Sequence, residues 1–322
     1  MIRQLADRAG KLVACAINKA AIITRFVVVY RFGAAIGEHV AMTAAVRHLA
    51  KNLQFRVIVL TNHDWVYCNN PRVFWCSTLW FLPFVIRKYG LAFLSRYQQS
   101  RLLEFKLRIP KESSFAAEMR TDRKRNQKHL IKIHTENWPT EFQPNECRPE
   151  IFFSKKELTK FEDSLPMEED YGLIQSEGKK SFTPNKDWGW SSFQEVVNKT
   201  KGKINWVQVG SSNDTRLNGC LDMCGKLSFR QLAFIFEKAR FGLFQEGMFT
   251  HLAAALRLET LTIYTGFLSP SISAYENNHA VVPDKVDCAP CWLLSSCPNA
   301  MACIKSVTPQ KVAAKTLNTF ID

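Results

Sequence analysis

The sequence has no apolar run long enough to cross a lipid bilayer. Its longest such run, residues 73–86, contains Pro83 and ends at two basic residues, whereas a membrane-spanning helix needs about 20 apolar residues. A clean signal sequence is also missing, because Lys19 and Arg25 interrupt the apolar stretch near the N-terminus. We therefore expect the protein to stay in the cytoplasm.

Two common nucleotide-binding motifs are absent as well. Neither the G-x-G-x-x-G dinucleotide fingerprint nor the P-loop occurs in the chain. Ten cysteines in 322 residues are too few for a small disulfide-stabilised scaffold. With 46% hydrophobic and 22% charged residues, the composition is typical of a globular protein and excludes disorder. The length predicts about two domains.

The excess of positive charge lies in one half of the chain only. Residues 1–165 hold 27 Lys and Arg against 14 Asp and Glu, an excess of 13 positive charges, whereas residues 166–322 hold 16 against 15. A field of one sign favours an anionic partner, such as a membrane surface, a phosphorylated acceptor or nucleic acid. A solvated basic face is the alternative.

Strands and helices alternate in both halves of the sequence. The uninterrupted apolar run at 26–30 is typical of a strand buried on both faces of a parallel sheet, and a helix at 38–50 and a strand at 56–61 follow. In the second half we expect strands at 172–175, 204–209, 241–244 and 261–264, and helices at 191–200, 228–238 and 251–257. The pattern predicts two α/β domains with parallel sheets.

Three other segments of the first half combine apolar or aromatic residues with cations. Residues 2–19 have the pattern of an amphipathic basic helix, residues 70–97 are rich in aromatic side chains, and residues 101–132 are strongly basic. Such segments suit a membrane interface or a bulky amphiphilic acceptor. Docking of the helix on the protein itself, and a helical hairpin with a solvated charged loop, remain open as alternatives.

Two loops have the form of an anion-binding site. In each, glycine follows a strand and precedes a helix, at Gly33 to Glu38 and at Glu246 to Met248. Such a loop presents backbone N–H groups and the positive end of a helix dipole. Glu38 lies near the carboxyl end of a strand, where it is either a general base or an acidic residue favoured by the dipole.

Three segments, in matching order, resemble glycosyltransferase family 9, the ADP-heptose:lipopolysaccharide heptosyltransferases. Residues 37–47 are similar to the family's Gly-Asp-x-x-x-x-x-Pro-x-x-Arg, residues 186–188 to its Lys-x-Trp, and residues 246–256 to Asp-Ser-Gly-x-x-His-Leu-Ala-Ala-Ala-Leu. The cysteine-bearing tail, with Cys288, Cys291, Cys297 and Cys303, also resembles that of many members.

This resemblance implies the GT-B fold, with two Rossmann-like domains facing a central cleft. It implies an acceptor-binding domain at 1–165 and a nucleotide-sugar-binding domain with the cysteine-rich tail at 166–308. A last helix, within 309–322, would return toward the N-terminal domain.

Site residues carry over where they match the family's motifs. Glu38 occupies the place of the catalytic base and Lys186 that of the lysine at the donor phosphates. The expected donor-binding residues are Gly37, Ser181, Thr183, Lys186, Glu246, Gly247, Met248, Phe249, Thr250 and His251. The chain departs from the family at four of its positions, where Glu38 and Glu246 replace Asp, Gly247 replaces Ser and Met248 replaces Gly. The donor sugar is therefore heptose or another hexose-like sugar.

The four clustered cysteines have the spacing C-x2-C-x5-C-x5-C. Four thiolates can close a tetrahedral Zn²⁺ or Fe site, which would be structural because no coordination position stays open. A second C-x2-C arm is missing, so reduced thiols or one local disulfide are the alternative. Catalysis in a family of this kind requires no cofactor.

The resulting expectation is an inverting, metal-independent glycosyltransferase that uses a nucleotide sugar and acts on a bacterial cell-envelope acceptor such as lipopolysaccharide core. Its partners would be an anionic glycolipid and the inner face of the cytoplasmic membrane, without nucleic acid. Two other hypotheses stay open: a basic nucleic-acid-binding protein with a metal-binding cysteine tail, and a non-catalytic glycosyltransferase-like scaffold.

Overall fold

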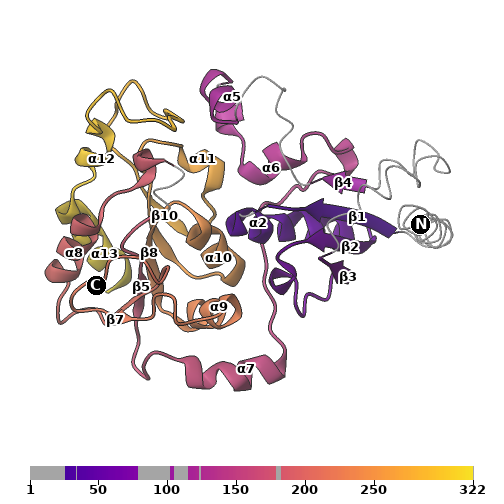
Figure 1. Cartoon of the computed structure of the whole chain (residues 1–322), viewed down its shortest axis with the longest axis horizontal. Coiled ribbons are helices and arrows are strands. Elements are labelled where there is room, and N and C mark those ends of the chain that lie inside the picture. Colours follow the sequence, from indigo (N-terminus) through magenta and orange to yellow (C-terminus); the bar gives the residue numbers. More distant parts are fainter. Residues whose placement is uncertain are drawn as a thin grey trace, which may run out of the picture. The chain divides into compact units, whose positions relative to one another are not determined.

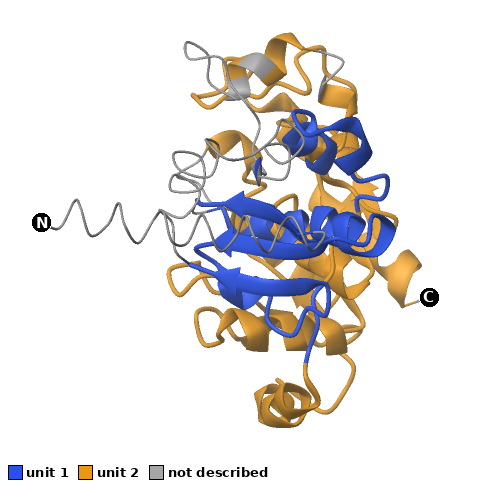
Figure 2. Cartoon of the chain, turned by 90° about the vertical axis from the view of Figure 1, so that its right-hand side faces the viewer, with its two compact units in different colours: residues 1–108, 131–147, 151–153 blue, residues 109–130, 148–150, 154–322 orange. Residues whose placement is uncertain are grey.

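Two compact units make up the chain, each with its own parallel sheet (Figure 2). The structure is a computed structural model that describes residues 26–33, 35–78, 102–104, 115–122, 125–178 and 183–321. Unit 1 comprises residues 1–108, 131–147 and 151–153, and unit 2 comprises residues 109–130, 148–150 and 154–322. The chain thus passes between the units several times, instead of once near residue 165.

Helix α7 (Lys155–Phe161) lies in unit 2, although we expected these residues in the N-terminal domain. Its Phe161 ring lies 6.0 Å from that of Phe234 in α9 (Phe229–Lys238). Glu157 of α7 forms an ion pair of 3.0 Å with Arg230 of α9. These two contacts hold α7 on unit 2, which is why the boundary falls before Ser154.

Unit 1 is built on a four-stranded parallel sheet with the order β3-β2-β1-β4. The strands are β1 (Phe26–Arg31), β2 (Arg56–Thr61), β3 (Val73–Ser77) and β4 (Leu102–Glu104). The inner residues of β1 are all buried, so the expected strand with two covered faces is confirmed. Helix α2 (Ile36–Arg47) follows β1 and continues as a π-helical turn (His48–Asn52), which replaces the single helix expected to residue 50.

Three further helices lie between β4 and β5 along the chain (Figure 1). They are α5 (Phe115–Thr121), α6 (Leu130–Thr135) and α7. The amphipathic helix predicted at 2–19 lies outside the described residues, as do residues 79–97 of the aromatic segment and residues 101, 105–114 and 123–124 of the basic segment 101–132. Among the described residues, no helix combines the length and the apolar character needed to span a membrane.

Unit 2 contains a six-stranded parallel sheet with the order β10-β9-β8-β5-β6-β7. Its strands are β5 (Gly172–Ile174), β6 (Trp206–Gln208), β7 (Leu221–Asp222), β8 (Phe241–Gln245), β9 (Thr260–Ile263) and β10 (Asn278–Val281). Its helices besides α7 and α9 are α8 (Trp190–Lys199), α10 (Met248–Leu256), α11 (Pro270–Ser273), α12 (Ala302–Ser306) and α13 (Pro309–Phe320). All the strands and helices expected in this half are confirmed, with ends shifted by a few residues.

Helices cover both faces of this sheet. Alternate residues of β8 point to opposite sides of the sheet, so their contacts show which helices lie on each face. Phe241 and Leu243 belong to the core that includes α8 and α13, and Phe320 of α13 stacks on Phe241 at 4.4 Å. Phe244 faces the other way, where it stacks on Phe236 of α9 at 5.2 Å. The packing of the last helix, α13, lies within unit 2, against α8.

Gly172 in β5 provides a test of this core. A Cβ atom there would lie 2.7 Å from the Phe241 ring and 3.0 Å from the Trp206 ring, and both rings are buried. We expect Gly172→Ala to lower the free energy of unfolding by about 1–3 kcal/mol, because buried rings have little room to move. Urea denaturation measures the change. The exposed Lys201→Ala is the control and should stay within about 0.5 kcal/mol of wild type; an equally small effect of Gly172→Ala would contradict the packing described.

Candidate functional site

In unit 1 the candidate site lies at the carboxyl end of β1. The strands β2 and β4 flank β1 on opposite sides, and open parallel sheets bind ligands where the strand order reverses. Helix α2 begins directly after this point, so Gly37 and Glu38 occupy its first turn. The topology thus places the predicted base at the ligand-binding edge of the sheet.

Glu38 forms an ion pair with Arg31, the last residue of β1. The Glu38 side chain is 25% exposed and that of Arg31 is 12% exposed, so the carboxylate is held in one place yet still meets solvent. A neighbouring guanidinium favours the ionised carboxylate. A carboxylate that is fixed by an ion pair and still meets solvent can be approached by the hydroxyl group of an acceptor.

The loop between β1 and α2 is fixed by polar side chains that the sequence analysis did not single out. Asn62 bonds to Gly33 in both directions, with its amide donating to the carbonyl at 2.9 Å and its oxygen accepting the N–H at 3.1 Å. The His39 ring bridges the Gly33 carbonyl at 3.2 Å and the Thr61 hydroxyl at 2.9 Å. His63 adds a second ring bond of 3.0 Å to the same carbonyl. The sequence could have indicated these side chains, because residues 61–63 lie at the carboxyl end of β2.

In unit 2 the strand order reverses between β5 and β8. From β5 the chain builds outward to β6 and β7, and then returns to place β8 on the other side of β5. The loops that leave β5 and β8 therefore flank the binding position of this sheet. The first of these loops carries Lys186, and the second carries Glu246 and Gly247.

Lys186 and Glu246 form an ion pair that joins these two loops. The lysine side chain is 23% exposed and the glutamate side chain 9%. Ser273 donates a hydrogen bond of 3.4 Å to the Glu246 carboxylate, and the Lys186 ammonium lies 5.7 Å from the centre of the Phe267 ring. The structure thus brings together two of the predicted donor-binding residues, with the lysine more accessible than its partner.

His251 lies in the second turn of α10 and is buried. Its Nδ1 is 2.6 Å from the Tyr275 hydroxyl. Burial, reinforced by the positive charge of Lys186, lowers the pKa of His251 to about 4. The imidazole is therefore neutral at neutral pH, and its hydrogen bond to Tyr275 fixes the ring.

The other residues predicted to bind the donor have different environments. Gly247 is the N-cap of α10, and its N–H donates to the Thr250 hydroxyl at 3.3 Å; this cap begins the helix at Met248, earlier than the expected residue 251. Phe249 packs on the rings of α9 and β8. The Thr183 hydroxyl donates to the Leu293 carbonyl at 2.8 Å and caps the following turn. Ser181 lies outside the described residues.

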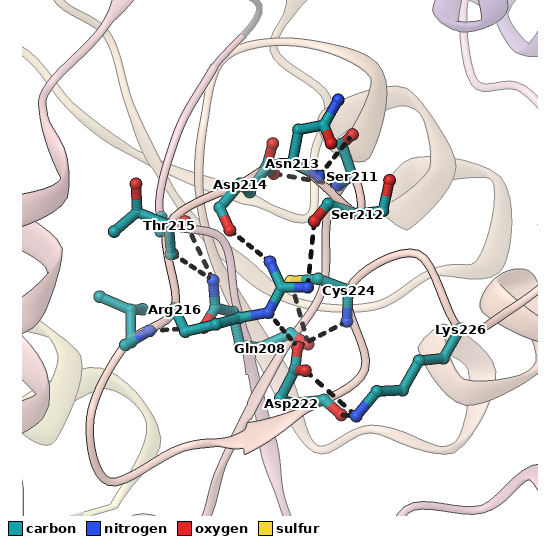
Figure 3. Close-up of polar contacts among 12 residues, drawn as sticks. Gln208, Ser211, Ser212, Asn213, Asp214, Thr215, Arg216, Asp222, Cys224 and Lys226 are labelled. Atoms are coloured by element: carbon teal, nitrogen blue, oxygen red, sulfur yellow. Dashed lines mark hydrogen bonds and ion pairs between the residues drawn. The ribbon is translucent and has the colours of Figure 1, made fainter.

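A cluster of polar side chains begins in the loop after β6, the strand that neighbours β5 (Figure 3). The sequence analysis did not predict this cluster. Arg216 forms an ion pair of 3.0 Å with Asp222, which Lys226 also approaches at 3.1 Å. Slight burial opposes ionisation of Asp222, but the Cys224 N–H and the two cations outweigh it and lower the pKa to about 2. Thr215 donates a 2.7 Å bond to Glu177 in the loop after β5. This cluster therefore joins the loops after β5 and β6.

The four cysteines of the tail are free thiols. Burial raises the pKa of Cys291 and Cys303, which disfavours the thiolates that a metal requires. Cys303 lies against Gly266, because a Cβ atom added to this glycine would be 2.9 Å from the Cβ atom of Cys303. Within the part of the chain that the structure describes, no three His, Cys, Asp or Glu side chains are grouped as metal ligands. The segment is folded onto the turn after β9, and the Zn or Fe site expected from the spacing stays a prediction.

The two buried histidines predict how stability depends on pH. Burial lowers the pKa of His39 to about 4, with help from His63, as it does for His251. Unfolded histidines titrate near 6.5, so the contribution of both rings is full above pH 6.5 and is lost as the pH falls toward 4. We expect the free energy of unfolding to fall by up to about 2.7 kcal/mol per pH unit in this window, at about 1.4 for each proton.

Urea denaturation between pH 7 and pH 5 measures this slope. His39→Gln and His251→Gln should each remove about half of it, because each variant leaves one buried imidazole. A wild-type slope near zero would contradict this, because it would show that the folded protein takes up protons on these rings as readily as the unfolded chain does.

Comparison with known proteins was consistent with this geometry. A family model, Glycosyltransferase family 9 (heptosyltransferase), matches residues 88–298, which is more than half of the chain. No curated protein matches the sequence significantly.

Several solved structures share the fold. The iron-containing dodecameric glycosyltransferase TibC from enterotoxigenic E. coli is 13% identical, with a TM-score of 0.63, over 92% of this chain and 76% of that one. The ADP-heptose LPS heptosyltransferase II of E. coli is 13% identical, with a TM-score of 0.60, over 91% and 98%. A family 9 glycosyltransferase of Veillonella parvula is 15% identical, with a TM-score of 0.62, over 91% and 97%. The chain therefore belongs to glycosyltransferase family 9, and its two parallel α/β sheets are those of the GT-B fold.

Proposed function

We propose that this glycosyltransferase moves a heptose or another hexose-like sugar from a nucleotide sugar to a hydroxyl group of a cell-envelope acceptor, such as lipopolysaccharide core. The observation that carries the proposal is the joining of Lys186, Glu246 and the start of α10 at the strand reversal of unit 2. TibC, which shares the fold, was solved in complex with ADP-D-β-D-heptose. That complex supports a nucleoside diphosphate sugar as the donor.

The donor diphosphate suits the C-terminal site electrostatically. Lys186 supplies a positive charge that is partly exposed, and α10 supplies N–H groups and the positive end of its dipole beside Gly247. The neutral His251 ring adds polarity without adding charge. Glu246 keeps the lysine in place, and the carboxylate and the diphosphate then share its ammonium group.

The chemistry needs a base at the acceptor and charge stabilisation at the leaving group. Glu38 takes the proton of the acceptor hydroxyl, and the oxygen attacks the anomeric carbon from the face opposite the diphosphate. The bond from that carbon to the diphosphate breaks, so the configuration inverts. Lys186 and the N-terminus of α10 stabilise the charge that develops on the diphosphate, which is the work a metal ion does elsewhere.

An anionic glycolipid at the inner face of the cytoplasmic membrane is the acceptor that best suits unit 1. The edge strand of unit 1, β3, exposes the side chains of Phe74 (57%) and Trp75 (44%). These two consecutive side chains are both exposed because the register of β3 with β2 shifts between Val57 and Ile58. The Arg56 guanidinium lies 5.5 Å from the centre of the Phe74 ring. Aromatic rings beside cations, in the half of the chain with 13 excess positive charges, suit an anionic membrane surface.

Donor binding predicts a stabilised native state. One of ADP, UDP or GDP, or its sugar, should raise the melting temperature, because a ligand that binds only the folded protein stabilises it. Lys186→Ala should abolish most of that rise, whereas Lys160→Ala on the exposed side of α7 should leave it unchanged. Differential scanning fluorimetry with the nucleotide panel measures both. Absence of any shift in wild type would overturn the proposed donor class.

Membrane association predicts sedimentation with vesicles. The protein should cosediment with vesicles that contain phosphatidylglycerol and stay in solution with pure phosphatidylcholine, and the bound fraction should fall with added salt. Replacing Phe74 and Trp75 by Ser should reduce binding several-fold, while Val282→Ser, which removes an exposed apolar side chain from unit 2, should not. Equal binding to both kinds of vesicle would contradict a surface selective for anionic lipid.

A further inference from the structure

The turn that carries Lys186 is held on both sides by the C-terminal tail. The turn spans Pro184–Lys186 and is preceded by Thr183, whose hydroxyl accepts the Asn185 N–H at 3.2 Å. The Asn185 side chain is buried, and its amide nitrogen donates to the carbonyls of Leu293 and Ser295, both at 2.7 Å. Asn185 thus uses both of its side-chain N–H groups on one segment of the tail.

The other side of the turn is anchored by Trp188. Its indole N–H donates to the Val307 carbonyl at 2.7 Å, and its backbone N–H donates to the Gln245 side chain at 3.0 Å. Val307 follows α12 at the end of the tail, and Gln245 is the neighbour of Glu246. Lys186 therefore lies between two anchored residues, one on each side.

The tail segment is itself fixed to the body of unit 2. The N–H groups of Cys291 and Trp292 donate to the carbonyls of Gly266 and Phe267, both at 3.0 Å. The Trp292 indole is buried and donates to the Asn126 side chain at 2.5 Å. The segment can transmit this rigidity because it is bonded to the turn after β9 and to the Lys186 turn at once.

We propose that the tail segment 288–307 is a brace for Lys186, and that Asn185 is the positioning residue that connects the two. This inference rests on the proposed role of Lys186 at the donor diphosphate. Asn185 does not touch the donor; it acts by restricting where the ammonium group can lie. A charge that is already in place loses less entropy when the diphosphate binds. The brace also gives the cysteine-bearing tail a role that needs no metal.

Asn185→Asp is the sharpest test, because it keeps the shape of the side chain and removes both N–H donors. We expect the dissociation constant of the nucleoside diphosphate that stabilises wild type to rise about tenfold, as for the loss of one or two hydrogen bonds. In the Lys186→Ala background the same substitution should have little further effect, since Asn185 acts through Lys186. Isothermal titration calorimetry with the four proteins of this cycle gives both numbers. Asn205→Asp is the matched control, because its amide bonds to the Asp170 carbonyl at the opposite end of the strands.

The outcomes separate this inference from the proposed function. If Lys186→Ala weakens binding and Asn185→Asp does not, the brace is wrong while the role of Lys186 stands. If Asn185→Asp weakens binding equally in both backgrounds, its effect is general to the fold and the brace is again wrong. If wild type binds no nucleotide, the proposed function itself fails. Should Asn185→Asp not fold, Thr183→Val decides by the same cycle, because it removes both the 2.8 Å bond to Leu293 and the cap on the Asn185 N–H.

Discussion

The ion pair between Lys186 and Glu246 connects the two loops on which the proposed donor site depends. Both side chains are mostly buried, and a buried charge requires a partner nearby. The loop after β5 and the loop after β8 must therefore meet, and they meet where the strand order of the sheet reverses. His251 is neutral because it is buried beside the same lysine. The glutamate at 246, longer than the family's aspartate, still reaches the lysine across the reversal.

Unit 1 follows the same design with different residues. A charged pair, Arg31 and Glu38, lies at the carboxyl end of β1, and the loop beside it is fixed by Asn62 and His39. In both units a parallel sheet supplies the position and a helix start supplies the polar edge. Polar neighbours then restrict the charged side chain. The two units differ in their surfaces, because strands β2 and β3 of unit 1 carry exposed aromatic and basic side chains.

Much of this fold could be predicted from the sequence, because buried parallel strands are continuous apolar runs. The strand at 26–30 was predicted for that reason, whereas the last helix was expected from the resemblance to the family. The start of α10 was placed too late, because the cap is formed by Thr250 through a glycine N–H and not by a side chain at the N-cap. The division of the chain into compact units differs from the predicted boundary near 165 at α7, because the contacts of α7 with α9 are tertiary and leave no local signal.

The site was predicted in part for the same reasons. The roles of Glu38, Lys186, Glu246 and His251 come from the resemblance to family motifs and stay predictions. Asn62 and His63 were missed because their partner, Gly33, is about 30 residues away in sequence. The metal suggested by the cysteine spacing stays a prediction, and the carbonyl groups of Leu293 and Ser295 in that segment hold Asn185, which the sequence did not indicate.

The proposed sugar transfer needs a base in unit 1 and a donor site in unit 2. Mass spectrometry of the products formed from a panel of nucleotide sugars and cell-envelope extracts tests this transfer directly. With wild-type protein the acceptor should gain the mass of one sugar residue, and with folded Glu38→Gln it should not. An unmodified acceptor with every donor, or equal transfer by Glu38→Gln, would contradict it.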